Sequence, residues 1–196
     1  PDKEILVITD MEINEHELRM SPEYEKVFFI RSDPTLHVVL KRAQVQEAES
    51  VIILGDQTCP EPDAKSALIS LAITKLCHDL PHKPRIVAEI KNPDKVHHLR
   101  DAGVDEWVCS AYYGLGIIAQ AALFGKLSDV YQQLLTYSEE TNEIYLLNSD
   151  KYPQWFLGKN FAEIANVLIQ KRASKNPAIL IGIKRDNRVL LNPKAD

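Results

Sequence analysis

The sequence contains little cysteine and no long hydrophobic run, and each absence excludes a class of protein. Cys59, Cys77 and Cys109 are odd in number, widely spaced and without a C-x-x-C pair. We therefore expect reduced thiols in a reducing compartment rather than disulfides or a zinc site. No apolar run approaches the roughly 20 residues that cross a bilayer. The formal net charge of −5 argues against a nucleic-acid partner, which needs a basic surface.

The apolar residues that are present fall into five short runs. Hydrophobic residues make up 45% of the 196 residues and charged residues 26%, which is ordinary for a soluble globular protein with a sizeable core. The runs are rich in β-branched residues and cover 4–9, 26–30, 50–54, 85–90 and 106–109. Their near-continuous apolar character predicts strands buried on both faces of a parallel sheet.

Helical patterns lie between these runs, at residues 36–43, 64–80 and 92–103. Asp63 is predicted to cap the second helix, Pro93 to lie near the start of the third, and Gly103 to end it. The alternation of strands and helices predicts an α/β fold with a Rossmann-like, doubly wound parallel sheet over residues 1–110.

The chain after residue 110 has a different character. A helical pattern over residues 111–139 predicts one long crossover helix, with a bend expected at Gly125. Residues 140–196 predict a small α+β C-terminal lobe. It contains a strand-like stretch, EIYLLN, and an amphipathic helix within 158–173. Two further strands are predicted to form a hairpin at Asp186-Asn187.

Carboxylates follow or end four of the five predicted strands. Because ligands bind at the carboxyl ends of the strands in an open parallel sheet, we expect these side chains to form a ligand-binding site. The hypothesis favours a divalent cation or a ribose, which suit oxygen ligands. The alternative is that each carboxylate is solvated and only shapes its own turn. The candidates are Asp10, Asp33, Asp56 and Glu89.

A glycine pattern at the start of the long helix has two interpretations. Residues 114–119 read GLGIIA, which matches the G-x-G-x-x-A of a dinucleotide-binding turn and suggests an NAD(P)-dependent oxidoreductase. The pattern comes after the strands, however, and no strand ending in an acid follows it within the expected unit. The alternative is a packing or assembly helix whose small residues allow close approach. Its face comprises Gly114, Gly116, Ala119, Ala122, Leu123 and Leu127.

Several stretches, in order along nearly the full chain, resemble RCK domains (regulators of potassium conductance, TrkA-N and TrkA-C). These are IRSDPTLHVVLKRAQVQEAESVIILGD, EPDAKSALISLAITKL, RIVAEIKNPDKVHHLRDAGVDEWV, GLGIIAQAALFGKLSDV and AILIGIKRDNRVLLNP. The second and fourth are similar to segments of large-conductance calcium-activated potassium channels. The resemblance implies a regulatory domain rather than an enzyme.

The same resemblance implies partners and an effector. RCK domains are cytoplasmic gating modules that pair through the crossover helix and the C-terminal lobe. They assemble as dimers or as tetrameric or octameric rings beneath the membrane pore domain of a potassium channel or transporter. Ligand binding changes the angle between lobes and acts on the pore. The expected effector is a divalent cation such as calcium, or a nucleotide such as NAD or an adenine nucleotide.

The chain departs from the family pattern at several positions. EILVITD aligns with the second Rossmann strand, so the given sequence offers no counterpart of the first strand and its glycine turn. The strand order 3-2-1-4-5-6 would then have a hole in its middle, unless another segment supplies that strand. Ser32 replaces a glycine, and Lys91 and Ser66 replace acids that contribute to calcium sites. A calcium site would rest on Asp56 and Glu89 alone. A further alternative is a structural ring subunit whose ligand site has decayed.

Overall fold

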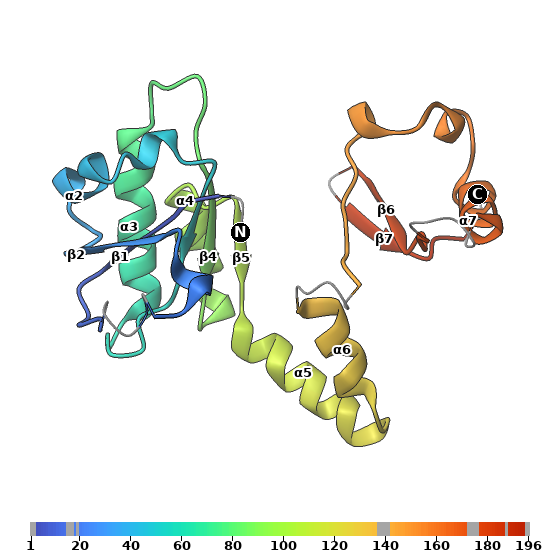
Figure 1. Ribbon diagram of the computed structural model, residues 1–196, viewed down its shortest axis with the longest axis horizontal. Coiled ribbons are helices and arrows are strands. Elements are labelled where there is room, and N and C mark those ends of the chain that lie inside the picture. Colours follow the sequence, from blue (N-terminus) through green and yellow to red (C-terminus); the bar gives the residue numbers. More distant parts are fainter. Residues whose placement is uncertain are drawn as a thin grey trace. The chain divides into compact units, whose positions relative to one another are not determined.

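The computed structural model describes residues 3–14, 18, 20–136, 142–171, 177–186 and 188–194. The chain divides into two compact units, residues 1–132 and 133–196. The first unit contains β1 (Ile5–Thr9), β2 (Val27–Arg31), α2 (His37–Arg42), β3 (Ser50–Ile53), α3 (Pro62–Leu76), β4 (Arg85–Glu89), α4 (Val96–Asp101), β5 (Glu106–Val108) and α5 (Ser110–Leu123) (Figure 1). Short 3-10 turns lie at Pro22–Tyr24, Val45–Glu47 and Pro93–Lys95. The five strands lie where the sequence predicts them.

The strands form two separate parallel sheets. β1 pairs with β2 from Ile5↔Val27 to Thr9↔Arg31. β4 lies between β3 and β5, with Val51 opposite Ile86 and Val87 opposite Glu106. Among the described residues no strand pairs with the outer edge of β1 or of β3. In the described residues the parallel strands are therefore divided into β2-β1 and β3-β4-β5, with no strand hydrogen-bonded between β1 and β3, as the resemblance to the family pattern predicts.

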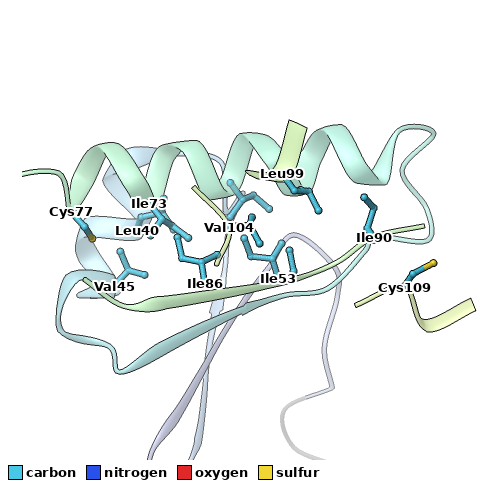
Figure 2. Packing of buried hydrophobic residues seen from close by; sticks show 12 residues of the cluster. Leu40, Val45, Ile53, Ile73, Cys77, Ile86, Ile90, Leu99, Val104 and Cys109 are labelled. Carbon is cyan, nitrogen blue, oxygen red and sulfur yellow. The ribbon is translucent and has the colours of Figure 1, made fainter. Parts of the chain in front are cut away.

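The core lies between α3 and the three-stranded sheet. α3 packs against α2, α4, β3 and β4, and its Ile73 is almost fully buried. Figure 2 shows Ile73 with Ile53 of β3 and Ile86 of β4 in the layer between helix and strands. This packing fixes α3 over the sheet, so that the start of the helix lies near the carboxyl ends of the strands.

The opposite side of the strands differs from expectation. Successive residues of a strand point to opposite faces, so Ile52 points away from the side that buries Ile53. Ile52 and Leu54 are highly exposed, and Phe28 of β2 is also exposed. The prediction of strands buried on both faces is therefore wrong for β2 and β3, whereas the apolar side chains of β4 are buried or half-buried. No element within the described ranges covers these side chains.

Helix ends in the first unit confirm two predictions and correct two others. Pro93 begins the turn that leads into α4, and Gly103 ends that helix with a positive φ. Asp63 is not the cap of α3. Glu61 precedes the helix and Pro62 is its first residue, while the Asp63 carboxylate accepts a hydrogen bond from the backbone N–H of Lys91. The predicted single long helix is also interrupted. α5 ends at Leu123 and α6 (Leu127–Leu135) begins after a turn around the predicted bend, with Lys126 at φ 70°.

The second unit contains α7 (Phe161–Gln170) and a hairpin of β6 (Gly182–Arg185) and β7 (Arg188–Leu191). Short turns lie at Ser149–Lys151 and Gln154–Phe156. α7 begins with a capping box in which the Asn160 side chain and the Glu163 side chain each accept from the other's backbone N–H. The hairpin confirms the predicted strand pair, while Asn187 and the expected domain boundary at residues 139–140 lie outside the described residues.

One prediction for the second unit is wrong. Residues 143–148 form no strand within the part of the chain that the structure describes, because no partner edge pairs with them. Their apolar side chains, Ile144 to Leu147, are exposed. None of the described helices has the length and apolar character that crossing a membrane would require.

Candidate functional site

Four carboxylates lie at the carboxyl ends of the strands, as the sequence predicts. Asp10 directly follows β1, Asp33 follows β2 by two residues, Asp56 follows the end of β3 by three, and Glu89 ends β4. We call these four residues the carboxylate rim. Ion pairs link β1 and β3 across the open position: Lys3 pairs with Glu49 before the strands, and a single lysine bridges Asp10 and Asp56 after them.

The bridging lysine is Lys65, in the first turns of α3. Its Nζ lies 2.9 Å from Asp10 Oδ2 and 2.8 Å from Asp56 Oδ2. The side chains of Lys65 and Asp56 are only 21% and 16% exposed. Hydrogen bonds to Asp56 and then to Asp10 raise the pKa of Lys65 above its ordinary value. The structure therefore brings Asp10 and Asp56 together around a cation that belongs to the chain.

Asp33 and Asp56 sit in two loops with the same local pattern, D-P-T and D-Q-T. Asp33 Oδ1 accepts from the Thr35 backbone N–H at 2.9 Å and from Thr35 Oγ1 at 2.8 Å. Asp56 Oδ1 accepts from the equivalent Thr58 donors at 2.8 and 2.7 Å. The backbone bond to Thr35 is the main cause of a lowered pKa of Asp33, and nearby Lys65 adds to it. Each loop thus holds Oδ1 of its aspartate by local hydrogen bonds, and Oδ2 takes no part in these bonds.

Glu89 makes a different set of contacts. Its Oε2 accepts from the Gly55 N–H at 2.9 Å, and its Oε1 accepts from the hydroxyl of Ser110. The Ser110 bond, followed by the Gly55 bond, lowers the pKa of Glu89, and Lys91 contributes as a nearby charge. Ser110 is the first residue of α5, so Glu89 ties the end of β3 to the start of that helix.

A buried carboxylate lies behind this part of the rim. Asp63 is 6% exposed, and its two oxygens accept from the backbone N–H groups of Lys91 at 2.8 Å and Asn92 at 3.0 Å. These bonds hold the loop that follows β4 against the start of α3. They also place the Lys91 side chain beside Gly55 and Glu89, as its Cε lies 3.6 Å from where a Cβ on residue 55 would be.

Sequence reasoning missed Lys65 and the role of Ser110. Lys65 lies in a helix whose pattern predicts only a core face, and a pairing over 55 residues with Asp10 leaves no local signal. The D-x-T spacing could have indicated the two loops, because Asp and Thr separated by two residues often bond locally.

The described residues contain no group of three or more histidine, cysteine, aspartate or glutamate side chains placed to hold a metal ion. Asp56 and Glu89 bond to different donors, Lys65 and Thr58 in one case and Gly55 and Ser110 in the other. A cation site on this pair stays a prediction.

The glycines that suggest a dinucleotide turn lie within a helix. Gly114 and Gly116 are inside α5 rather than in a turn before it, and neither has a positive φ. In a dinucleotide fingerprint the first glycine makes the tight turn between strand and helix. The oxidoreductase interpretation is therefore not favoured.

Comparisons with known proteins extend this description. Residues 1–88 match the sequence model of the calcium-activated potassium channel slowpoke-like RCK domain. The resemblance to RCK domains is confirmed. The chain is 27% identical over 125 residues to the calcium-gated potassium channel TvoK of Thermoplasma volcanium, an alignment that covers 61% of this chain and 35% of that protein.

A likeness in fold extends beyond the matched residues. The structure of the human SLO3 gating ring matches 98% of this chain and 37% of that chain, with a TM-score of 0.68 and 21% identity. At that identity the likeness shows the fold. The chain spans about one third of the length of TvoK and of the SLO3 structure.

One prediction concerns the charge at the rim. Asp56→Asn is expected to lower the free energy of unfolding at pH 7, because the variant loses the carboxylate that Lys65 and Thr58 stabilise. The Lys65 hydrogen bond is the main cause of the lowered pKa of Asp56, so this contribution is present above the unfolded pKa of about 3.9 and is lost as pH falls through the lower folded value. Urea unfolding at pH 7 and below pH 4 checks it.

The matched control for this variant is Asp79→Asn, which changes a carboxylate that is 97% exposed. We expect little change in stability at either pH for the control. A deficit of Asp56→Asn that stays constant over the pH range would contradict the assignment of the stabilisation to the ionised carboxylate.

Proposed function

We propose that the chain is a ligand-sensing gating domain of a potassium channel or transporter, located on the cytosolic face of the membrane. The observation that carries the proposal is the match of residues 1–88 to the slowpoke-like RCK domain, with a fold likeness to a gating ring along 98% of the chain. Such a domain acts as a coupling device rather than a catalyst: an effector binds one conformation better and so shifts the equilibrium toward it.

The effector site that we propose is the carboxylate rim. Its contacts support a route from the rim to the rest of the molecule, because Glu89 bonds both to Gly55 after β3 and to Ser110 at the start of α5. A ligand that changes the position of Glu89 alters the anchoring of α5. The effector classes are a divalent cation, as in the calcium-gated relative, and a nucleotide.

Binding measurements test this site. Calcium, magnesium, NAD and adenine nucleotides are titrated separately into the full chain by isothermal calorimetry, with Glu89→Gln as the variant and Glu143→Gln, in the second unit, as its match. Saturable binding of one compound that Glu89→Gln weakens and Glu143→Gln does not supports the rim as the effector site. Binding of none leaves the domain as a structural ring subunit and contradicts the sensing role.

The second part of the proposal is self-association through α5. No residue of α5 is buried within this chain, although its composition is largely apolar. Exposed large side chains on it include Tyr112, Leu115, Ile118 and Leu123. An exposed apolar surface of this kind is typical of an interaction site. We propose that a second copy covers it, with residues 111–139 as the assembly segment between the N-terminal lobe (1–110) and the C-terminal lobe (140–196).

Leu123→Asp is therefore expected to shift the chain from dimer or ring toward monomer. Leu123 is 78% exposed on α5, and a carboxylate buried at a subunit interface without a partner is unfavourable. Multi-angle light scattering over a range of concentrations gives the mass of each species. We expect a loss of affinity of roughly tenfold or more, which corresponds to about 1.4 kcal/mol.

Val38→Asp is the control, since Val38 is 72% exposed on α2 and lies outside the proposed assembly segment. It should leave the mass distribution unchanged. A wild-type chain that is monomeric at every concentration would contradict the assembly part of the proposal, whatever the calorimetry shows.

A further inference from the structure

Lys65 occupies the space between two rim carboxylates that belong to different sheets. It is held by Asp10 and Asp56 at 2.9 and 2.8 Å, which are normal lengths for charge-assisted hydrogen bonds. Asp33 is close enough for the Lys65 charge to lower its pKa. One ammonium group therefore pairs with two of the four carboxylates that the sequence predicts as ligands and acts on a third through its charge.

Lys65 is the charged partner of Asp10 and Asp56, and the other donors to the rim are of different kinds. Thr58 and Thr35 satisfy one oxygen each of Asp56 and Asp33 with hydroxyl and backbone donors, and these donors carry no full charge. Among the other described cations at these strand ends, Lys91 lies beside Glu89 and Gly55, and Arg31 of β2 pairs with Glu12 at 3.6 Å. Among the ion pairs of the described residues, Lys65 is the cation that Asp10 and Asp56 share.

We propose that Lys65 is a built-in cation that fills the position between Asp10 and Asp56 and keeps divalent cations out of this part of the rim. The lysine is part of the chain and cannot diffuse away. A calcium or magnesium ion must therefore break both ion pairs and move a largely buried side chain into water before it can reach the two Oδ2 atoms. Like charges that approach within a few ångströms also repel strongly where water is partly excluded.

The inference sets the ligand class of the proposed function at the same site, and it rests on that proposal only for its biological meaning. It divides the rim in two. The Asp10–Lys65–Asp56 side is closed to divalent cations. A ligand that acts on this domain must use Glu89 or contact the bridge with groups that accept hydrogen bonds from an ammonium, such as oxygen atoms of a nucleotide.

Lys65→Met tests the proposal, because methionine keeps an unbranched chain of similar length and removes the charge. Calcium chloride and magnesium chloride are titrated into the full wild-type chain and the variant at matched ionic strength. We expect no saturable binding at this site in the wild type and a gain of at least about tenfold in calcium affinity in Lys65→Met, since a repelling charge is replaced by two free carboxylates. Adding Asp56→Asn to Lys65→Met should abolish the gain.

Lys65→Arg and Lys75→Met are the matched variants. The arginine keeps the charge and should exclude calcium as the wild type does. Lys75 is an exposed lysine of the same helix, so Lys75→Met reports the effect of losing one positive charge elsewhere on the molecule. A gain in calcium affinity in Lys75→Met equal to that in Lys65→Met would overturn the proposal.

A measurement on the wild type decides the question if Lys65→Met does not fold. Amine acylation followed by peptide mass spectrometry compares the modification rates of Lys65 and Lys75 with and without millimolar calcium. An unchanged ratio supports a lysine that calcium does not displace, whereas faster labelling of Lys65 with calcium overturns the proposal. Wild-type calcium binding that Asp10→Asn removes would also overturn it, yet would identify the effector of the proposed function, so the two failures are distinguishable.

Discussion

Gly103→Ala is expected to destabilise the first unit by about 2 to 4 kcal/mol, the sum of a left-handed backbone cost and an overpacking cost. Gly103 has a φ of +88°, where any residue with a Cβ is strained. A Cβ at this position would lie 2.4 Å from Thr74 Oγ1 and 3.1 Å from Thr74 Cγ2. Thr74 cannot move away freely, because it is a partly buried residue of α3 whose hydroxyl donates to the carbonyl of Ala102.

The contacts around Gly103 explain why the strain cannot relax. The hydroxyls of Ser70 and Thr74 on α3 both donate to the carbonyl of Ala102 at 3.0 Å. These two bonds hold the end of α4 against α3, and Val104 follows directly into the core beside β5. Pushing residue 103 away from Thr74 would break at least one of them and leave the Ser70 hydroxyl, which is fully buried, without its partner.

Urea unfolding monitored by circular dichroism measures the effect, with Gly158→Ala as the control. Gly158 also has a positive φ, 71°, but a Cβ there meets nothing within 4 Å, so alanine should cost only the left-handed backbone term of about 1 to 2 kcal/mol. Adding Thr74→Ala to Gly103→Ala should recover the part of the loss that comes from the contact with Oγ1. Equal stability of Gly103→Ala and the wild type would contradict the structure at this turn.

The parts of the fold that the sequence predicts are those with a local cause. Five apolar runs gave the five strands within one residue at each end, and Gly103 ended its helix because a positive φ favours glycine. The separation of β1-β2 from β3-β4-β5 in the described residues could also be predicted, because the resemblance aligns EILVITD with the second Rossmann strand. Local patterns of this kind can be recognised in a sequence without any knowledge of tertiary contacts.

The features that the sequence did not reveal depend on distant partners. Asp63 is a residue type that often caps helices and lies at the start of a helical pattern. Its carboxylate, however, accepts from backbone N–H groups 28 and 29 residues away. Residues 143–148 have strand composition, but a strand exists only when another edge pairs with it. At the rim, the four carboxylates could be predicted because each lies at a strand end. Lys65 could not, because it reaches Asp10 and Asp56 only through the packing of α3 on the sheet.

Asp63→Asn is expected to lower the free energy of unfolding by about 2 to 3 kcal/mol, the range for losing a hydrogen bond to a buried charged group and leaving a donor unpaired. The Asp63 carboxylate accepts from two backbone N–H groups, those of Lys91 and Asn92. An amide offers one acceptor oxygen, so its NH₂ group would face one of the two N–H donors. The variant also removes a negative charge from the first turn of α3, where the helix dipole favours it.

Amide hydrogen exchange locates the effect of Asp63→Asn. The amides of Lys91 and Asn92 should exchange faster than in the wild type, whereas amides of the second unit should be unchanged. Asp94→Asn is the control, because Asp94 is exposed and uses its backbone N–H rather than its carboxylate in the neighbouring turn, and its stability should stay within about 0.5 kcal/mol. Because the same two bonds hold Lys91 beside Glu89, Asp63→Asn should also change effector affinity at the rim. A variant as stable as the wild type, with slow exchange at both amides, would show that Asp63 does not anchor this loop.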